Sequence, residues 1–404
     1  MPALSFTSLL LIGLVAVAAP LLLQILPRLG VPSLVLEIIG GIIVGPAVLG
    51  WVHVDAPVQV LSDLGLGMLL FMAGFEIDPD RLRGKVVKCA LVGYAWSIAL
   101  AIAIGYLTGI GEFVLDPPLI AIALMSTSLG LLVPLLKDVG ETESNFGQLI
   151  IAAGTIAEFV PIVLLSLFFS ATADSAAVKV VLLAGFAALV AAGGIALIRL
   201  GQLNWLSKVL RRLEDTSAQL RVRLAIALAL AFAVAAAEFG LAMILGAFLA
   251  GVIVRLVGQH EPEVQPQFQL KLDAIAFGFL VPIFFVTTGA ELDVRSLFER
   301  PAALVKVPIF LAALLVARGL PALAYRRLIP RRQMISAGLL QATTLTLPIV
   351  VVHIGIALGK LRTDTGAALL TAGLLSVIIY PRLGLAVLHR RVRPEPLVRY
   401  EQVG

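Results

Sequence analysis

Apolar runs of about 20 residues, each bounded by charged residues, Pro or Gly, follow one another along almost the whole chain. A helix needs about 20 such residues to cross the hydrocarbon core of a bilayer. The pattern therefore predicts an all-α, multi-pass membrane protein. We expect thirteen transmembrane helices, at residues 6–27, 31–50, 58–77, 86–110, 116–136, 146–170, 177–200, 219–237, 239–257, 268–290, 302–325, 333–359 and 365–388.

The distribution of Lys and Arg supports the count of thirteen. Glu238 alone separates the eighth span from the ninth, and one long helix over 219–257 would give twelve spans instead. With thirteen spans, 23 of the 30 basic residues fall on one side of the membrane, six fall on the other, and Arg318 lies within a span. Because basic residues concentrate in cytoplasmic loops, the N-terminus is predicted outside and the C-terminus in the cytoplasm.

Composition excludes several classes of protein. The chain is 60% hydrophobic and 14% charged, whereas a soluble domain is about 45–50% apolar and about 25% charged. Its single cysteine, Cys89, excludes a disulfide scaffold, and the net charge of +5 is explained by the cytoplasmic loops rather than by a nucleic-acid partner. No cluster of ligands has metal-enzyme spacing, and no phosphate loop or hydrolase triad stands out. We expect neither enzymatic activity nor a cofactor.

Two segments repeat each other at a constant offset of 215 residues. Residues 74–82 and 289–297 share a Gly, a Glu, an Asp and a Leu, and the glycine pair 40 and 45 has the same spacing as the pair 246 and 251. The matched spans are seven apart, an odd number, so the two copies are predicted to lie in opposite orientations across the bilayer. The glycine pairs themselves are interpreted as sites of close helix packing.

The repeat predicts how the chain is divided. Residues 1–200 form the first half with a linker helix, and residues 201–218 form a cytoplasmic linker. Residues 219–390 form the second half, and residues 391–404 form a cytoplasmic tail. No soluble regulatory domain is expected.

The fifth and twelfth spans contain hydroxyl groups and a proline where a lipid-facing helix would have Leu and Val. Their sequences are STSLGLLVP (126–134) and QATTLTLP (341–348). Unwound backbone survives in a membrane only where protein or water satisfies it, and paired interrupted helices are common in secondary transporters. We expect a binding site at the two interruptions, although simple kinks are an alternative. Its hydroxyl residues are Ser126, Thr127 and Ser128, and then Thr343, Thr344 and Thr346.

Two ionisable residues lie near the centres of their spans, Glu158 and Arg318. A charge at the bilayer centre costs at least about 2.5–3.5 kcal/mol and normally marks function. A carboxylate removed from water holds either a proton or a cation, which is the chemistry of a cation/proton exchanger. Thr155, on the same helical face, is a candidate oxygen ligand for the transported cation. The alternative is that Glu158 only neutralises Arg318.

The remaining charged residues are assigned lesser roles. Arg318 keeps its proton at any physiological pH, so it is predicted to be a fixed counter-charge. Glu37 and Asp63 are predicted to orient helices or to line the cytoplasmic and external funnels, with helix capping or interfacial solvation as the alternative. His353 is interpreted as a packing or rim residue.

The chain resembles the monovalent cation:proton antiporter-2 family, which includes Kef-type and Nap-type proteins. The resemblance rests on five motifs in the family's order, at residues 36–50, 61–80, 126–136, 153–159 and 279–294. It implies a Nha/Nap-type fold of thirteen helices with two crossing broken helices, a homodimer, and an elevator-like movement of a core bundle.

The resemblance also implies roles for individual residues. Glu158 stands where the family has its ion-binding Asp, Thr127 and Ser128 fall near the ion, and Arg318 matches the basic residue of the eleventh helix. Ala157 departs from the pattern, because many members carry a second acid, an Asn or a Gln there. With this acid absent, exchange of one cation for one proton is favoured, and Arg318 is free to pair with Glu158. The Kef-type nucleotide-sensing domain is expected to be absent.

The sequence thus predicts a secondary active transporter of the cell membrane that exchanges Na⁺ or K⁺ for H⁺, with the cation and the proton competing for Glu158. Two alternatives are a channel-like potassium efflux protein without proton coupling and an ion-driven solute symporter.

Overall fold

The computed structural model describes residues 6–25, 32–77, 84–110, 116–142, 144–168, 176–201, 219–258, 265–295 and 301–389, and every regular element in them is a helix. The elements of the first half are α1 (Thr7–Ile25), α2 (Ser33–Val44), α3 (Ala56–Glu76), α4 (Gly84–Ile110), α5 (Pro117–Leu124), α6 (Leu129–Asp138), α7 (Asn145–Phe168) and α8 (Ala176–Gly201).

The second half has the same kinds of element, with more irregular turns. They are α10 (Leu220–Glu238), α11 (Met243–Gly258), α12 (Gln265–Ile275), the π-helix η3 (Ala276–Leu280), α13 (Val281–Glu291), α15 (Pro301–Leu314), the π-helix η4 (Leu315–Gly319), the 3₁₀-helix η5 (Leu320–Arg327), α16 (Arg331–Gln341), α17 (Thr346–Ala357) and α18 (Thr363–His389).

Helical structure occupies each of the thirteen predicted ranges. Within the described residues, nine helices are long and apolar enough to cross a membrane, and shorter apolar helices occupy the other four ranges. The separation of the eighth span from the ninth is confirmed, because α10 ends at Glu238 and α11 begins at Met243. Gly240, with a φ of 69°, supplies the left-handed residue that the turn between them requires.

The second helix is shorter than its apolar run suggests. Apolarity predicts a helix over 31–50, but α2 ends at Val44. Gly45 and Pro46 follow, and the chain turns back through Gly50, whose φ is 65°. The Gly50 N–H donates to the carbonyl oxygen of Gly45, which closes this turn. Of the apolar residues that continue beyond the helix, Val52 is buried, whereas Val48, Leu49 and Trp51 are exposed.

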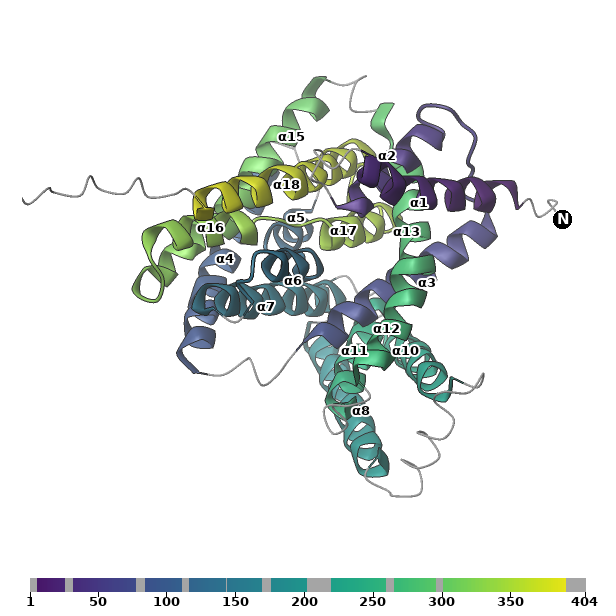
Figure 1. The fold of residues 1–404 in the computed structure, drawn as a ribbon, viewed down its shortest axis with the longest axis horizontal. Coiled ribbons are helices and arrows are strands. Elements are labelled where there is room, and N and C mark those ends of the chain that lie inside the picture. Colours follow the sequence, from purple (N-terminus) through teal and green to yellow (C-terminus); the bar gives the residue numbers. More distant parts are fainter. Residues whose placement is uncertain are drawn as a thin grey trace, which may run out of the picture.

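The helices form two groups, each built from both halves of the chain (Figure 1). The wall group contains α1–α3 and α10–α13, residues 7–76 and 220–291. The core group contains α4–α7 and α15–α18, residues 84–168 and 301–389. Helix α8 packs against α11, α10 and α7. The sequence halves are therefore not the spatial units, because each group takes helices from both.

Glycines bring the backbones of the wall group together. A methyl group on Gly41 of α2 would overlap the carbonyl oxygen of Val286 in α13, and one on Gly251 of α11 would overlap that of Phe71 in α3. Val286 and Phe71 are 215 residues apart, so the two contacts are copies of one another. The predicted close packing at the other glycines is confirmed as well: a methyl group on Gly40 would overlap Val15 of α1, and one on Gly246 would overlap the carbonyl oxygen of Phe232 in α10.

Ionic contacts, one of them buried, join helices of the core group at one end. Lys306 of α15 is 6% exposed and donates to the Thr365 hydroxyl at 2.7 Å and to the Asp364 carboxylate at 3.4 Å, both in α18. Lys360, just before α18, forms an ion pair of 3.3 Å with Asp116 at the start of α5. These contacts hold three helix ends of the core group in fixed relative positions.

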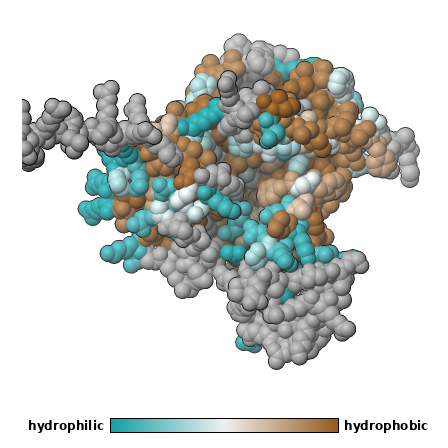
Figure 2. Space-filling view, in the orientation of Figure 1, coloured by the Kyte–Doolittle hydropathy of each residue, from teal (hydrophilic) through white to brown (hydrophobic). Residues whose placement is uncertain are grey.

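The outer surface is strongly apolar, as a lipid-facing surface must be. Leu10, Leu14, Val17 and Leu21 of α1 are all exposed. Figure 2 shows hydrophobic residues over much of the visible face, including the part formed by α1 and α13.

We predict that Gly74→Ala destabilises the protein by about 1–3 kcal/mol, because its methyl group would overlap the carbonyl oxygen of Phe248 in α11. Gly67→Ala, in the same helix but with no atom near the added methyl group, is the matched control. It should be neutral or stabilise the helix by up to about 1 kcal/mol. Thermal unfolding of both variants in detergent measures the difference, and equal melting temperatures would contradict the close packing.

Candidate functional site

The two predicted helix interruptions are present and lie side by side. Residues 125–128 separate α5 from α6, and residues 342–345 separate α16 from α17. The Ser128 N–H donates to the carbonyl oxygen of Thr343 at 3.0 Å, and the Leu345 N–H donates to the Ser128 hydroxyl at 3.0 Å. Ser126 and Thr344 share a hydrogen bond of 2.7 Å between their hydroxyl groups. We call these two segments the crossing.

Helix α18 forms hydrogen bonds with the backbone of the crossing. The Ser376 hydroxyl accepts a hydrogen bond from the Thr344 N–H at 3.1 Å and donates to the Thr344 carbonyl oxygen at 3.0 Å. Backbone groups freed by the interruptions therefore have partners inside the protein. At the crossing the N-terminal ends of α6 and α17 carry partial positive charge, and the C-terminal ends of α5 and α16 carry partial negative charge.

Arg318 lies on the negative side of the crossing. It belongs to η4 and is 1% exposed. Its Nε donates to the Thr127 hydroxyl at 2.8 Å, and its Nη1 donates to the Ser97 hydroxyl at 3.1 Å. The Thr127 hydroxyl in turn donates to the carbonyl oxygen of Gln341, the last residue of α16, at 2.5 Å. The guanidinium also lies over the Tyr94 ring, 5.3 Å from its centroid.

Glu158 lies elsewhere, so the alternative in which it directly neutralises Arg318 does not hold. Neither Arg318 nor Glu158 takes part in an ion pair within the part of the chain that the structure describes. The Glu158 carboxylate instead lies near the backbone N–H of Leu129, the first residue of α6. The acid is thus held at a positive helix end, and the base near a negative one.

A cavity of about 120 Å³ adjoins Glu158 at the boundary between the wall and core groups. Three glutamates from three helices line it: Glu37 of α2, Glu76 of α3 and Glu158 of α7. Gly130 and Thr346, near the starts of α6 and α17, complete the side that belongs to the core group. Glu158 is 3% exposed and Glu37 is 5% exposed. We call this space the glutamate cavity.

The glutamates do not form a preassembled metal site. Within the part of the chain that the structure describes, no three His, Cys, Asp or Glu side chains lie close enough together to hold one metal ion. A cation in this cavity would be bound by a carboxylate together with hydroxyl, carbonyl or water oxygens. Such a ligand set suits a weakly held monovalent ion that has to leave again.

Glu76 is a candidate site residue that the sequence reasoning missed. Its Oε2 atom is buried and has no hydrogen-bond partner, and a methyl group on Gly130 would lie 3.9 Å from it. In the sequence, Glu76 stands out only as part of the repeat. The available signal was an acid that ends an apolar helix, in LLFMAGFE at residues 69–76.

The predicted hydroxyl residues are divided between two places. Ser126, Thr127, Ser128, Thr343 and Thr344 all lie in the crossing, whereas Thr346 lines the glutamate cavity. The Thr343 hydroxyl is buried and has no hydrogen-bond partner.

Thr155 is buried on the face of α7 predicted for it, but it does not line the glutamate cavity. Its hydroxyl donates to the carbonyl oxygen of Ile151 at 2.9 Å, within the same helix. The residue of α7 in the lining of this cavity is therefore Glu158 and not Thr155.

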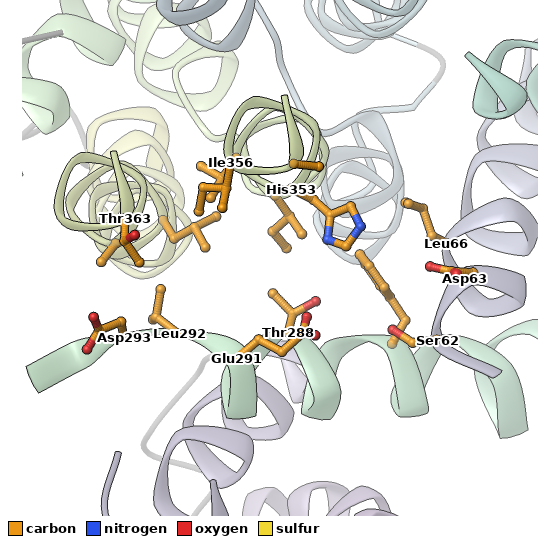
Figure 3. A pocket seen from close by; sticks show the side chains of 16 residues that line it. Ser62, Asp63, Leu66, Thr288, Glu291, Leu292, Asp293, His353, Ile356 and Thr363 are labelled. Carbon is orange, nitrogen blue, oxygen red and sulfur yellow. The ribbon is translucent and has the colours of Figure 1, made fainter. Parts of the chain in front are cut away.

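A second cavity of about 440 Å³ lies at the opposite ends of α3, α13 and α17 (Figure 3). Asp63, Glu291 and His353 line it, one from each helix. The Asp63 carboxylate accepts a hydrogen bond from Gln59 at 3.1 Å. Glu37 and Asp63 thus lie in different cavities, and His353 occupies an exposed position in the wall of the second one. We call this space the outer cavity.

We predict that Ser128→Ala destabilises the protein by about 1–3 kcal/mol, because it removes the acceptor of the buried Leu345 N–H. Ser166→Ala is the matched control, since this hydroxyl is fully buried but has no hydrogen-bond partner, so its loss should cost less than about 0.5 kcal/mol. Melting temperatures in detergent compare the two. A control that loses as much stability as Ser128→Ala would contradict the assigned role of Ser128.

Comparison with known proteins agrees with this geometry. Residues 13–385 match the family described as "Sodium/hydrogen exchanger, transmembrane". YjbQ of Bacillus subtilis is 30% identical over 97% of this chain, which spans 64% of YjbQ. The Na(+)/H(+)-K(+) antiporter GerN of Bacillus cereus is 29% identical over 70% of each chain.

A solved structure has the same fold. The sodium proton antiporter MjNhaP1 from Methanocaldococcus jannaschii, determined at pH 8, aligns with a TM-score of 0.65 and 18% identity, covering 94% of this chain and 97% of that one. The matched family covers most of the present chain, and its members are transporters rather than enzymes. The chain is therefore a multi-pass membrane protein that belongs to the sodium/hydrogen exchanger family.

Proposed function

We propose that this protein exchanges a monovalent cation, Na⁺ or K⁺, for H⁺ by alternating access, and that the two ions compete for Glu158. The observation that carries the proposal is the position of Glu158: a buried carboxylate at the N-terminal end of α6, beside a cavity between two helix groups. A carboxylate in such surroundings is costly when bare, so a bound proton and a bound cation are alternatives. Their mutual exclusion couples the two fluxes.

Arg318 has a different role in this proposal. A guanidinium does not release its proton at physiological pH, so Arg318 is not a proton carrier. Its bonds to Thr127 and Ser97 place a permanent positive charge beside the C-terminal end of α16. There it offsets the partial negative charge of the interrupted helix whether Glu158 holds a proton or a cation.

The two cavities support alternating access. Both lie at the boundary between the wall and core groups, at opposite ends of α3, α13 and α17. With thirteen crossings and the N-terminus outside, the glutamate cavity faces the cytoplasm and the outer cavity faces the exterior. The excess of Lys and Arg on the cytoplasmic side supports this orientation. Movement of the core group along the wall group, within a homodimer, would open each cavity in turn.

The choice between Na⁺ and K⁺ is left open by the ligands, because carboxylate and hydroxyl oxygens bind both ions. The name of GerN includes both, which supports testing the two ions side by side. An uncoupled potassium efflux protein and an ion-driven solute symporter predict different fluxes. The first would carry current without counter-movement of H⁺, and the second would need a solute for flux.

Glu158→Gln should reduce cation-induced proton flux to the level of empty vesicles, because the neutral side chain binds neither a proton nor a cation in exchange. Glu158→Asp, which keeps the carboxylate, should retain exchange. Proteoliposomes with a trapped pH-sensitive dye, given NaCl, KCl or LiCl pulses, provide the measurement.

Glu238→Gln is the matched control for this experiment, because Glu238 is an exposed glutamate at the end of α10. Its flux should stay within about twofold of the wild-type value. Wild-type exchange rates in Glu158→Gln would overturn the proposal. Cation current with no proton movement in the wild-type protein would favour the uncoupled alternative.

A further inference from the structure

The two cavities are built from equivalent positions of the internal repeat. Seven residues of α3 line one cavity or the other. For five of them, the residue 215 positions later lines the opposite cavity. The pairs are Ser62 with Phe277, Leu66 with Val281, Leu69 with Phe284, Ala73 with Thr288, and Glu76 with Glu291.

Helix α3 and the segment that leads into α13 also make a close backbone contact at positions that are equivalent in the repeat. A methyl group on Gly65 of α3 would overlap the carbonyl oxygen of Leu280, the residue that precedes α13. Positions 65 and 280 also differ by 215, so the helices meet at equivalent points. Glu76 and Glu291 each lie eleven residues beyond their contact position. Glu76 lines the glutamate cavity and Glu291 lines the outer cavity, so each cavity contains one of the two equivalent acids.

The position of Glu76 shows how such an acid is placed in the cavity next to Glu158. Its unpartnered Oε2 lies beside Gly130, close to the start of α6. In the second half, α17 begins at Thr346 after its interruption as α6 begins at Leu129 after the other one. In the conformation that exchanges the roles of the two repeats, Glu291 would approach the start of α17 as Glu76 now approaches the start of α6.

A second observation on α13 points to a polar role for the same surface. The Thr287 hydroxyl, one turn before Glu291, is fully buried and has no hydrogen-bond partner. Its equivalent in the first half is Met72, which lines the glutamate cavity. When the outer side opens, Thr287 would therefore join the cavity wall and add an oxygen beside the Glu291 carboxylate.

We infer that Glu291 is the cation-capturing carboxylate of the outer cavity, and that Glu76 serves the same purpose in the glutamate cavity. Each acid acts on cations that arrive from its own side, whereas Glu158 acts on both. The other titratable groups that line the outer cavity with Glu291 are Asp63 of α3, Asp293 beyond the end of α13 and His353 of α17 (Figure 3). This inference rests on the exchange activity proposed for Glu158.

The test measures the half-saturating Na⁺ or K⁺ concentration separately on each side of the membrane, in right-side-out and inverted vesicles. Glu291→Gln should raise it several-fold when the cation is added on the side of the outer cavity, and leave the opposite side unchanged. Glu76→Gln should give the reverse pattern. Both variants should keep measurable exchange at saturating cation, because each leaves Glu158 intact.

Asp293→Asn is the matched control, since Asp293 also lines the outer cavity but lies beyond the end of α13. It should change the half-saturating concentration much less than Glu291→Gln does. An equal effect of Asp293→Asn would mean that the general field of the cavity, not Glu291, captures the ion. Equal effects of Glu291→Gln on both sides, or none on either, would also overturn the inference.

Failure of the underlying function gives a different result. A wild-type protein with no cation-dependent proton flux from either side would contradict the exchange activity itself. A wild-type protein that exchanges normally, combined with variants that lack a side-specific effect, would contradict only the role of Glu291 and Glu76.

Discussion

The structure depends on the need to satisfy backbone groups at two helix interruptions inside an apolar protein. Each interruption leaves N–H and C=O groups that lipid cannot bond. They are satisfied by the other interruption and by buried hydroxyls, with Ser128 serving the backbone of residues 343 and 345. Because each segment supplies the other's partners, neither can exist alone. The crossing is therefore a single unit, and the charged residues take their positions from it.

The charged groups follow the polarity of the crossing. Glu158 lies at the positive start of α6, and Arg318 reaches the negative end of α16 through Thr127. Opposite charges are thus separated by the crossing and are not joined in an ion pair. In the exchange proposed above, this separation would leave the Glu158 carboxylate available to mobile ions, whereas a direct pair with Arg318 would occupy it. A site that must bind and release its ion benefits from such incomplete neutralisation.

The sequence alone could predict the features that depend on local pattern. The interruptions at 126–134 and 341–348, the depth of Glu158 and the separation at Glu238 all follow from polar residues placed in apolar runs. Features that depend on tertiary contacts could not be predicted. The end of α2 at Val44 is set by a turn that is itself apolar, and the partner of each close-packed glycine is set by which helix it meets.

Contacts between residues far apart in the sequence could not be predicted either. From the sequence, Lys306 would be placed near a loop, but in the structure it is buried against α18. Glu76 would be taken only as part of the repeat, but it lines the cavity beside Glu158. In both cases the neighbours lie in distant parts of the chain.

The glycine contacts of the wall group have a consequence for how such a protein changes over evolutionary time. Where Gly41 and Gly251 let main chains touch, no side chain stands between the helices to be exchanged for another. Substitution of these two glycines is disfavoured, because every other residue adds atoms where there is no space. Ion preference can diversify only among side chains that face the cavities and the core group. New specificities therefore have to arise on one side of an unchanging scaffold.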